Sequence, residues 1–108
     1  MKRKAERKDF SGEAKICLLG EDIEFSATIQ DISLSGIRII VTGRIVKANT
    51  LIEIKMCVDG RPIQCNGRVA WTLPLRPGFG DIILFDAGIE LINVIPEDSE
   101  FLKKFCGS

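Results

Sequence analysis

Hydrophobic and polar residues alternate along most of the chain, with the period of two that is typical of half-buried β-strands. Residues 23–30 show it most clearly, because four apolar side chains alternate there with four polar ones. Turn-forming residues such as Asp59-Gly60 interrupt the pattern. The segments that read as strands are 14–19, 23–30, 36–41, 51–58, 63–71, 81–86 and 88–95. The pattern therefore predicts an all-β protein of six or seven short strands.

The end of the chain has a different pattern. Pro96 and the acidic residues after it suit the first turn of a helix, and Lys103-Lys104 suit its last turn. Phe101, Leu102 and Phe105 form one apolar stripe that can pack on a sheet. We expect a helix over residues 96–105. Because closure removes exposed strand edges, we expect the strands to form a small antiparallel barrel.

The composition is that of one ordinary globular domain. The chain has 108 residues, of which 45% are hydrophobic and 28% are charged. No apolar run approaches the roughly 20 residues that a membrane helix needs. The N-terminal Met-Lys-Arg-Lys lacks the apolar segment of a secretion signal. These features predict a cytoplasmic protein without membrane insertion.

The residue types that serve most metal sites and active sites are scarce. The chain has no histidine, and its four cysteines show no C-x-x-C spacing. We expect free, mostly buried thiols, with Cys57 and Cys65 on opposite faces of a hairpin. We interpret Asp81, Asp86 and Glu90 as solvated acids around a turn. The sequence therefore predicts no metal, no cofactor and no enzymatic activity.

Charge is concentrated at the N-terminus. Residues 1–8 contain five basic residues and one acid, or +4, so the other hundred residues sum to −4 in a chain of net charge zero. We divide the chain into a flexible basic arm, residues 1–10, and a barrel with its helix, residues 11–108. The arm suits an anionic partner, although a solvated tail has the same composition. Arg3 and Arg7 could clasp two groups of one ligand, since the guanidinium fork fits phosphate and the O6/N7 edge of guanine.

A second polar motif, D-x-S-x-x-G, follows the best strand pattern. Asp31 can accept hydrogen bonds from the two adjacent donors on the edge of guanine. Ser33 and Ser35 can donate to phosphate oxygens or cap a turn, and Gly36 permits close approach of a ligand. An ordinary turn between two strands is the alternative reading. Together with the arm, the motif indicates a site for a guanine nucleotide or a phosphate.

The pair of motifs resembles the signature of the PilZ domain family. Arg3-x-x-x-Arg7 precedes Asp31-x-Ser33-x-x-Gly36, and Gly67 to Trp71, Gly88 to Leu91 and the final helix follow in the order usual for that family. The resemblance covers nearly the whole chain. It implies a six-stranded antiparallel barrel with a C-terminal helix, which binds the bacterial second messenger cyclic di-GMP.

The resemblance also implies roles for individual residues. Arg3 and Arg7 would hold guanine faces and phosphates, Asp31 would bind a guanine edge, Ser33 would support the phosphate or the loop, and Gly36 would allow the path of the loop. Many relatives carry a doubled arginine where this chain has one arginine between two lysines, and lysine lacks the bidentate fork. Possible secondary contacts are Lys2, Lys4, Ser35, Arg38 and Trp71.

A binding protein of this size would signal through association. We expect ligand to order the arm and so alter a contact with an unidentified effector protein, in motility, adhesion or biofilm matrix production. The protein would be a monomer or a ligand-induced dimer. One alternative is a degenerate member of the family that binds protein and no nucleotide. Another is a small nucleic-acid-binding barrel, which the net acidic body disfavours.

Overall fold

The computed structural model describes residues 7–43, 46–75 and 83–107, with residues 7–9 described by their backbone alone. Its regular elements are six strands and one helix. They are β1 (Arg7–Leu18), β2 (Glu24–Ser33), β3 (Gly36–Thr42), β4 (Leu51–Val58), β5 (Arg61–Leu75), β6 (Leu84–Ile92) and α1 (Pro96–Gly107).

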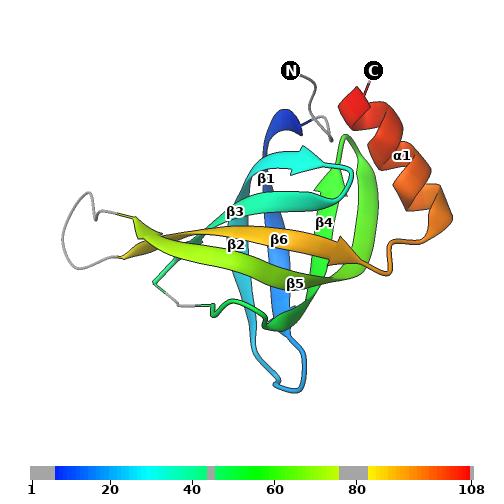
Figure 1. Cartoon of the computed structure of the whole chain (residues 1–108). Coiled ribbons are helices and arrows are strands. Elements are labelled where there is room, and N and C mark those ends of the chain that lie inside the picture. Colours follow the sequence, from blue (N-terminus) through cyan, green and yellow to red (C-terminus); the bar gives the residue numbers. More distant parts are fainter. Residues whose placement is uncertain (1–6, 44–45, 76–82, 108) are drawn as a thin grey trace.

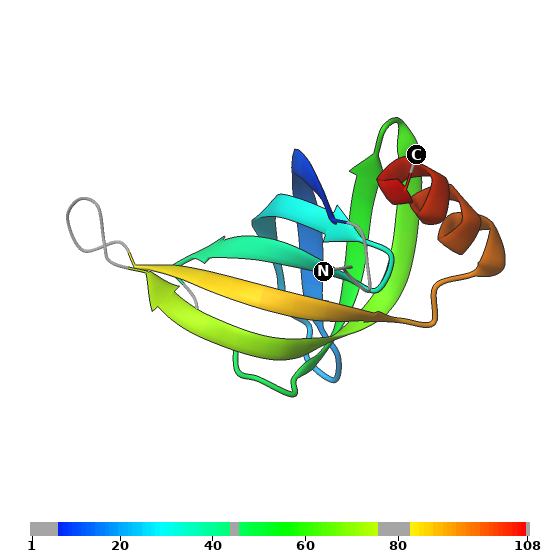
Figure 2. The ribbon, with the colours of Figure 1, turned by 45° about the horizontal axis from the view of Figure 1, so that its top comes forward.

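The six strands form a closed antiparallel barrel in the order β1-β2-β3-β6-β5-β4. Figure 1 and Figure 2 show the strands curling around one interior, with α1 at one end and the β5–β6 ribbon extending away from it. Consecutive strands are neighbours in the barrel, with the exception of β3 and β4. β3 pairs instead with β6, and β4 pairs with β1. The predicted six-stranded antiparallel barrel with one C-terminal helix is confirmed.

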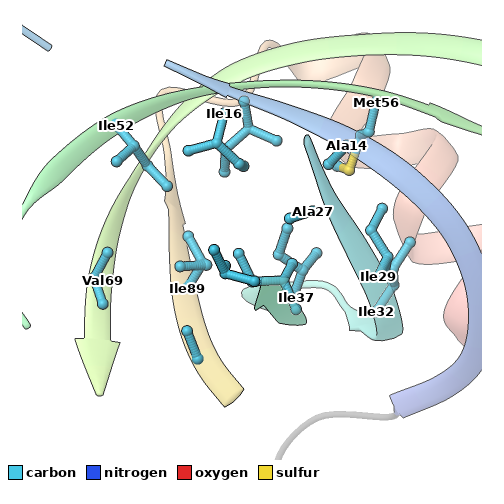
Figure 3. Close-up of a cluster of buried hydrophobic side chains, with 14 of the residues drawn as sticks. Ala14, Ile16, Ala27, Ile29, Ile32, Ile37, Ile52, Met56, Val69 and Ile89 are labelled. Atoms are coloured by element: carbon cyan, nitrogen blue, oxygen red, sulfur yellow. The ribbon is translucent and has the colours of Figure 1, made fainter. Parts of the chain in front are cut away.

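The interior is filled mainly by β-branched side chains that alternate with outward-facing ones. Figure 3 shows residues from all six strands converging on this core, among them Ile16, Ile29, Ile37, Ile52 and Ile89. Full burial of an isoleucine side chain contributes roughly 1.5–3 kcal/mol. The strand segments that alternate in the sequence therefore close into one apolar interior.

Two predicted boundaries are wrong. Residues 81–86 and 88–95 were expected to be separate strands, but β6 runs from Leu84 to Ile92 without a break, and Asp81 lies outside the described residues. Gly88 does not form a turn, because its backbone pairs with both Arg38 and Trp71 in the middle of the sheet. The second difference is that Asp31 and Ser33 belong to β2, so the connection to β3 is shorter than expected.

The start of the barrel also lies earlier than the expected division at residue 10. The backbone of β1 enters the sheet at Arg7, so residues 7–10 are part of a strand. Residues 1–6 of the predicted arm lie outside the described residues. Along the described part of the chain, no helix combines the length and apolar character that crossing a membrane requires.

The cysteines follow the prediction only in part. All four are free, but Cys65 and Cys106 alone are buried, whereas Cys57 is exposed. Cys57 and Cys65 do lie on opposite faces of the β4–β5 hairpin, as their alternation predicted. Burial raises the pKa of the Cys65 thiol to about 11, with a smaller contribution from the charge of Asp98. That thiol is therefore neutral at physiological pH.

Helix α1 is held against the barrel at both ends. Near its start, Arg61 of β5 donates to the buried Asp98 at 2.9 Å and lies over the ring of Phe101. Near its end, Phe105 meets Phe10 of β1 edge to face. Leu102, between these contacts, is fully buried. The predicted apolar stripe thus packs on the barrel.

We predict that Leu102→Ala lowers the free energy of unfolding by about 2–5 kcal/mol, because it leaves a cavity between α1 and the barrel. Urea denaturation followed by circular dichroism measures the change. Lys103→Ala, at the exposed neighbouring position, is the control and should stay within about 0.5 kcal/mol of the wild type. Equal effects of the two substitutions would show that α1 does not contribute to the core.

Candidate functional site

The pairing of β1 with β2 brings the two sequence motifs together. The backbone of Arg7 lies directly opposite Ser33, and Asp9 lies opposite Asp31. Neighbouring strands are about 4.8 Å apart, so the second arginine of the arm motif and the D-x-S segment share one end of one ladder. Lys2, Arg3 and Lys4 lie outside the described residues.

Ser33 closes the tight connection between β2 and β3. Its side chain is buried, its Oγ donates to the carbonyl oxygen of Gly36 at 3.1 Å, and it accepts from the Gly36 amide at 3.1 Å. Only Leu34 and Ser35 stand between the two strands, and both are exposed. The Ser33 hydroxyl therefore fixes the shape of the turn.

Gly36 is required by close packing against β6. A Cβ atom built at this position would lie 2.6 Å from the carbonyl oxygen of Ile89, a backbone atom that cannot rotate away. The same strand fixes the turn from another side, because the amide of Leu91 donates to the carbonyl oxygen of Ser35 at 2.9 Å. The glycine thus permits the approach of two backbones.

A row of four residues crosses the outer face of the barrel from this turn. Asp31 of β2 lies opposite Arg38 of β3, Arg38 opposite Gly88 of β6, and Gly88 opposite Trp71 of β5. The indole of Trp71 lies over Gly88, where any side chain would collide with it. Simple alternation along residues 63–71 would put Trp71 on the same face as Val69, but a bulge between the two residues turns the indole outward, and it is 41% exposed.

Arg38 and Asp86 form an ion pair with three hydrogen bonds on this face. The Nε of Arg38 lies 2.9 Å from Oδ1 of Asp86, and Nη2 lies 2.7 Å from Oδ2. These hydrogen bonds and the negative charge of Asp86 raise the pKa of Arg38, to which the charge of Asp31 adds. Asp86 was expected to be a solvated turn acid, but it is buried within β6.

The second pair on this face is more exposed. Arg68 of β5 donates to Oε1 of Glu90 through Nε at 3.1 Å and Nη2 at 2.5 Å, and about half of each side chain is accessible. Arg38 of β3 and Arg68 of β5 thus both lie on the outside of the barrel and are paired with acids.

A shallow groove of about 290 Å³ runs along the turn. Its lining includes Ser35, Gly36, Trp71, Gly88 and Glu90. It brings the second half of the D-x-S-x-x-G motif beside the exposed indole. A larger hollow of about 540 Å³ lies elsewhere, between the β4–β5 hairpin and the start of α1. Among the described residues, no three cysteine or acidic side chains cluster as metal ligands would.

The pairing of Asp86 with Arg38 was not predicted from the sequence. Asp86 is one acid among apolar neighbours in residues 83–89, and a hairpin turn explains such an acid as well as a buried pair does. The alternation of residue types did not indicate that Asp86 lies in the middle of a continuous strand. An acid within an otherwise apolar strand, together with an arginine in another strand, is the signal that could have indicated it.

Comparison with known proteins gives a family and a set of similar folds. The sequence model described as the PilZ domain matches residues 1–108. No curated protein sequence matches the chain. Several solved structures are similar in fold.

The PilZ domain with c-di-GMP of YcgR from Escherichia coli has a TM-score of 0.78 and 12% identity, and the alignment covers 98% of this chain and 89% of that one. The Bacillus subtilis inhibitor of motility, MotI/DgrA, has a TM-score of 0.76 and 15% identity, over 98% of this chain and 50% of that one. The K. pneumonia MrkH–c-di-GMP complex has a TM-score of 0.77 and 11% identity, and the alignment covers 97% of this chain and 51% of that one. The chain therefore spans about half the length of MotI/DgrA and MrkH, and at these identities the likeness concerns the fold.

We predict that Gly36→Ala lowers the free energy of unfolding by about 1–3 kcal/mol, because the added methyl group must displace the backbone of β6. Urea denaturation measures the loss. Gly107→Ala is the matched control, since a Cβ there would meet no atom within 4 Å. Wild-type stability of Gly36→Ala would mean that β3 and β6 can separate at this point without cost.

Proposed function

Because the family match extends over residues 1–108, the chain belongs to the PilZ domain family, and we propose that it binds cyclic di-GMP at the Arg7 end of the β1–β2 ladder. Two similar folds, the PilZ domain of YcgR and MrkH, were solved with c-di-GMP. The proposed role is that of a non-catalytic receptor, whose ligand changes its contact with an effector protein.

The observation that carries the proposal is the register of β1 and β2. Arg7 lies opposite Ser33, and Asp31 lies two residues away on the same strand. Residues that are 24 or more positions apart in the sequence thus lie side by side at one end of the β1–β2 ladder. A cyclic dinucleotide requires such an arrangement, because its bases and its two phosphates are close together.

Each residue of the surface has a chemical part in the proposal. The carboxylate of Asp31 accepts from the N1–H and the amino group of a guanine. Arg3 and Arg7 bind phosphate oxygens and stack on the bases, while Lys2 and Lys4 add positive charge. Ser33 acts indirectly, because its hydroxyl is already bonded to Gly36 on both sides and holds the turn in place. Gly36 and Ser35 form the groove wall next to the ligand.

We predict that Arg7→Ala and Asp31→Asn each weaken binding of cyclic di-GMP about 10- to 100-fold. A hydrogen bond to a charged group contributes roughly 1.5–3 kcal/mol, and each 1.4 kcal/mol is tenfold in affinity. Isothermal titration calorimetry of the wild type and both variants measures the effect, and its stoichiometry distinguishes one bound ligand from a stacked pair.

The control variants for this titration each remove a charge of the same sign at a position outside the proposed site. Lys15→Ala removes a cation from the exposed face of the same strand, and Asp22→Asn removes an acid from the β1–β2 turn. Both should bind like the wild type, and GTP and a random oligonucleotide should bind far more weakly. Absence of heat and of any thermal shift in the wild type would refute the proposal and favour a module that binds protein without nucleotide.

The proposal extends to the signal. A ligand held by Arg3, Arg7 and the barrel ties residues 1–6 to the β1–β2 surface, which changes the surface that an effector protein meets. We predict at least about tenfold slower amide exchange at residues 2–6 when ligand saturates the protein, measured by hydrogen–deuterium exchange. The Glu21-Asp22 turn is the internal reference and should not change. Unchanged exchange of the arm at calorimetric saturation would contradict this step.

A further inference from the structure

Asp86 and Arg38 lie beside Asp31 of the proposed ligand site. Arg38 is directly opposite Asp31 across the β2–β3 ladder, so their backbones are separated by the distance between neighbouring strands, about 4.8 Å. Gly88 of β6 lies opposite Arg38 of β3, and Asp86 is two residues before Gly88 on the same strand. Three charged residues therefore meet on the outer face next to the turn.

A buried acid at this point of β6 needs an explanation. Asp86 is 6% exposed, and the residues around it from Phe85 to Ile89 are apolar or glycine. Removing an ion pair of this kind in favour of apolar residues is often neutral or stabilising. The definite effect of Asp86 is on the position of Arg38, which it holds through three hydrogen bonds.

The geometry fixes the guanidinium in one orientation. Asp86 takes the hydrogens of Nε and one of Nη2 with both of its oxygens. The Nη1 group makes no hydrogen bond within the described part of the chain, and 45% of the Arg38 side chain is accessible. A long side chain that is already fixed loses little rotamer freedom when it binds a ligand. Arg38 is thus preorganised, with donors left for a further acceptor.

Guanine offers the matching acceptor. Its O6 atom is next to the N1–H on the same edge of the ring, so a base held by Asp31 turns O6 toward a neighbouring donor. Adenine carries an amino group, a donor, at the equivalent position. An arginine beside the carboxylate can therefore distinguish the two bases.

We propose that Arg38 binds O6 of the guanine held by Asp31 and selects guanine over adenine, and that Asp86 is the positioning residue that holds Arg38 for this contact. This inference rests on the proposed function, since it assigns the base specificity of the same site. It gives Asp86 and Arg38 separate parts, because only Arg38 touches the ligand.

The test measures the affinities of cyclic di-GMP and cyclic di-AMP for the wild type, Arg38→Met and Asp86→Asn by calorimetry. Arg38→Met should weaken the binding of cyclic di-GMP about tenfold or more and leave the binding of cyclic di-AMP nearly unchanged. The ratio of the two affinities then falls by the same factor. Asp86→Asn should also weaken cyclic di-GMP, although it removes a negative charge near an anionic ligand. A purely electrostatic effect of that charge would strengthen binding.

The Arg61–Asp98 pair supplies matched controls. It also joins a half-exposed arginine to a buried aspartate, with side-chain exposures of 40% and 7% against 45% and 8% for Arg38 and Asp86. It joins β5 to the first turn of α1, and neither residue lines the groove along the β2–β3 turn. Arg61→Met and Asp98→Asn should retain the wild-type discrimination between the two ligands, even where they lower the melting temperature.

The outcomes separate the two proposals. If the wild type binds no cyclic di-GMP, the proposed function fails, and this inference fails with it. If the wild type binds and Arg38→Met keeps its discrimination, this inference alone is overturned. Should Asp86→Asn not fold, the double variant Arg38→Met/Asp86→Leu replaces the pair by apolar side chains. A folded double variant with wild-type affinity for cyclic di-GMP would likewise overturn it.

Discussion

The pairing of β3 with β6 is the constraint on which the rest of the structure depends. These strands are separated in sequence by β4 and β5, and their ladder from Gly36 to Thr42 joins the two halves of the sheet into a closed barrel. Closure encloses the isoleucine-rich interior and leaves no edge along this seam. The same ladder brings the carbonyl of Ile89 against Gly36 and Asp86 against Arg38. The core and the outer polar row are therefore consequences of one long-range pairing.

The sequence predicted those features that depend on local alternation. β4, for example, has its buried residues at the alternate positions from Ile52 to Val58 that the pattern indicated. The helix begins at the expected Pro96 because a proline and two acids satisfy the first turn. The motif also predicted a turn between two strands, and Ser33 and Gly36 do flank the connection from β2 to β3. The motif left open whether its serine caps the turn or binds phosphate, and it could not reveal that its glycine is required by β6.

The features that local patterns could not predict come from bulges and from long-range partners. Register shifts occur in β1 between Asp9 and Gly12, in β2 between Ile29 and Asp31, and in β5 between Val69 and Trp71. Each shift reverses the faces that a simple alternation assigns, which is why Trp71 lies outside and not inside. The burial of Asp86 likewise depends on a partner 48 residues away, and a window of local sequence does not contain it.

The helix is coupled to both strands that carry the motifs. The Sγ of Cys106 lies 3.6 Å from the carbonyl oxygen of Ile32, the residue between Asp31 and Ser33. Phe105 contacts Phe10, three residues after Arg7 on β1. Packed interiors respond to a displaced neighbour by moving as units, because they have no free volume to absorb it. Under the proposed function, a ligand at Arg7 and Asp31 would therefore act on the last turn of α1, whose outer side, with Lys103 and Lys104, is exposed.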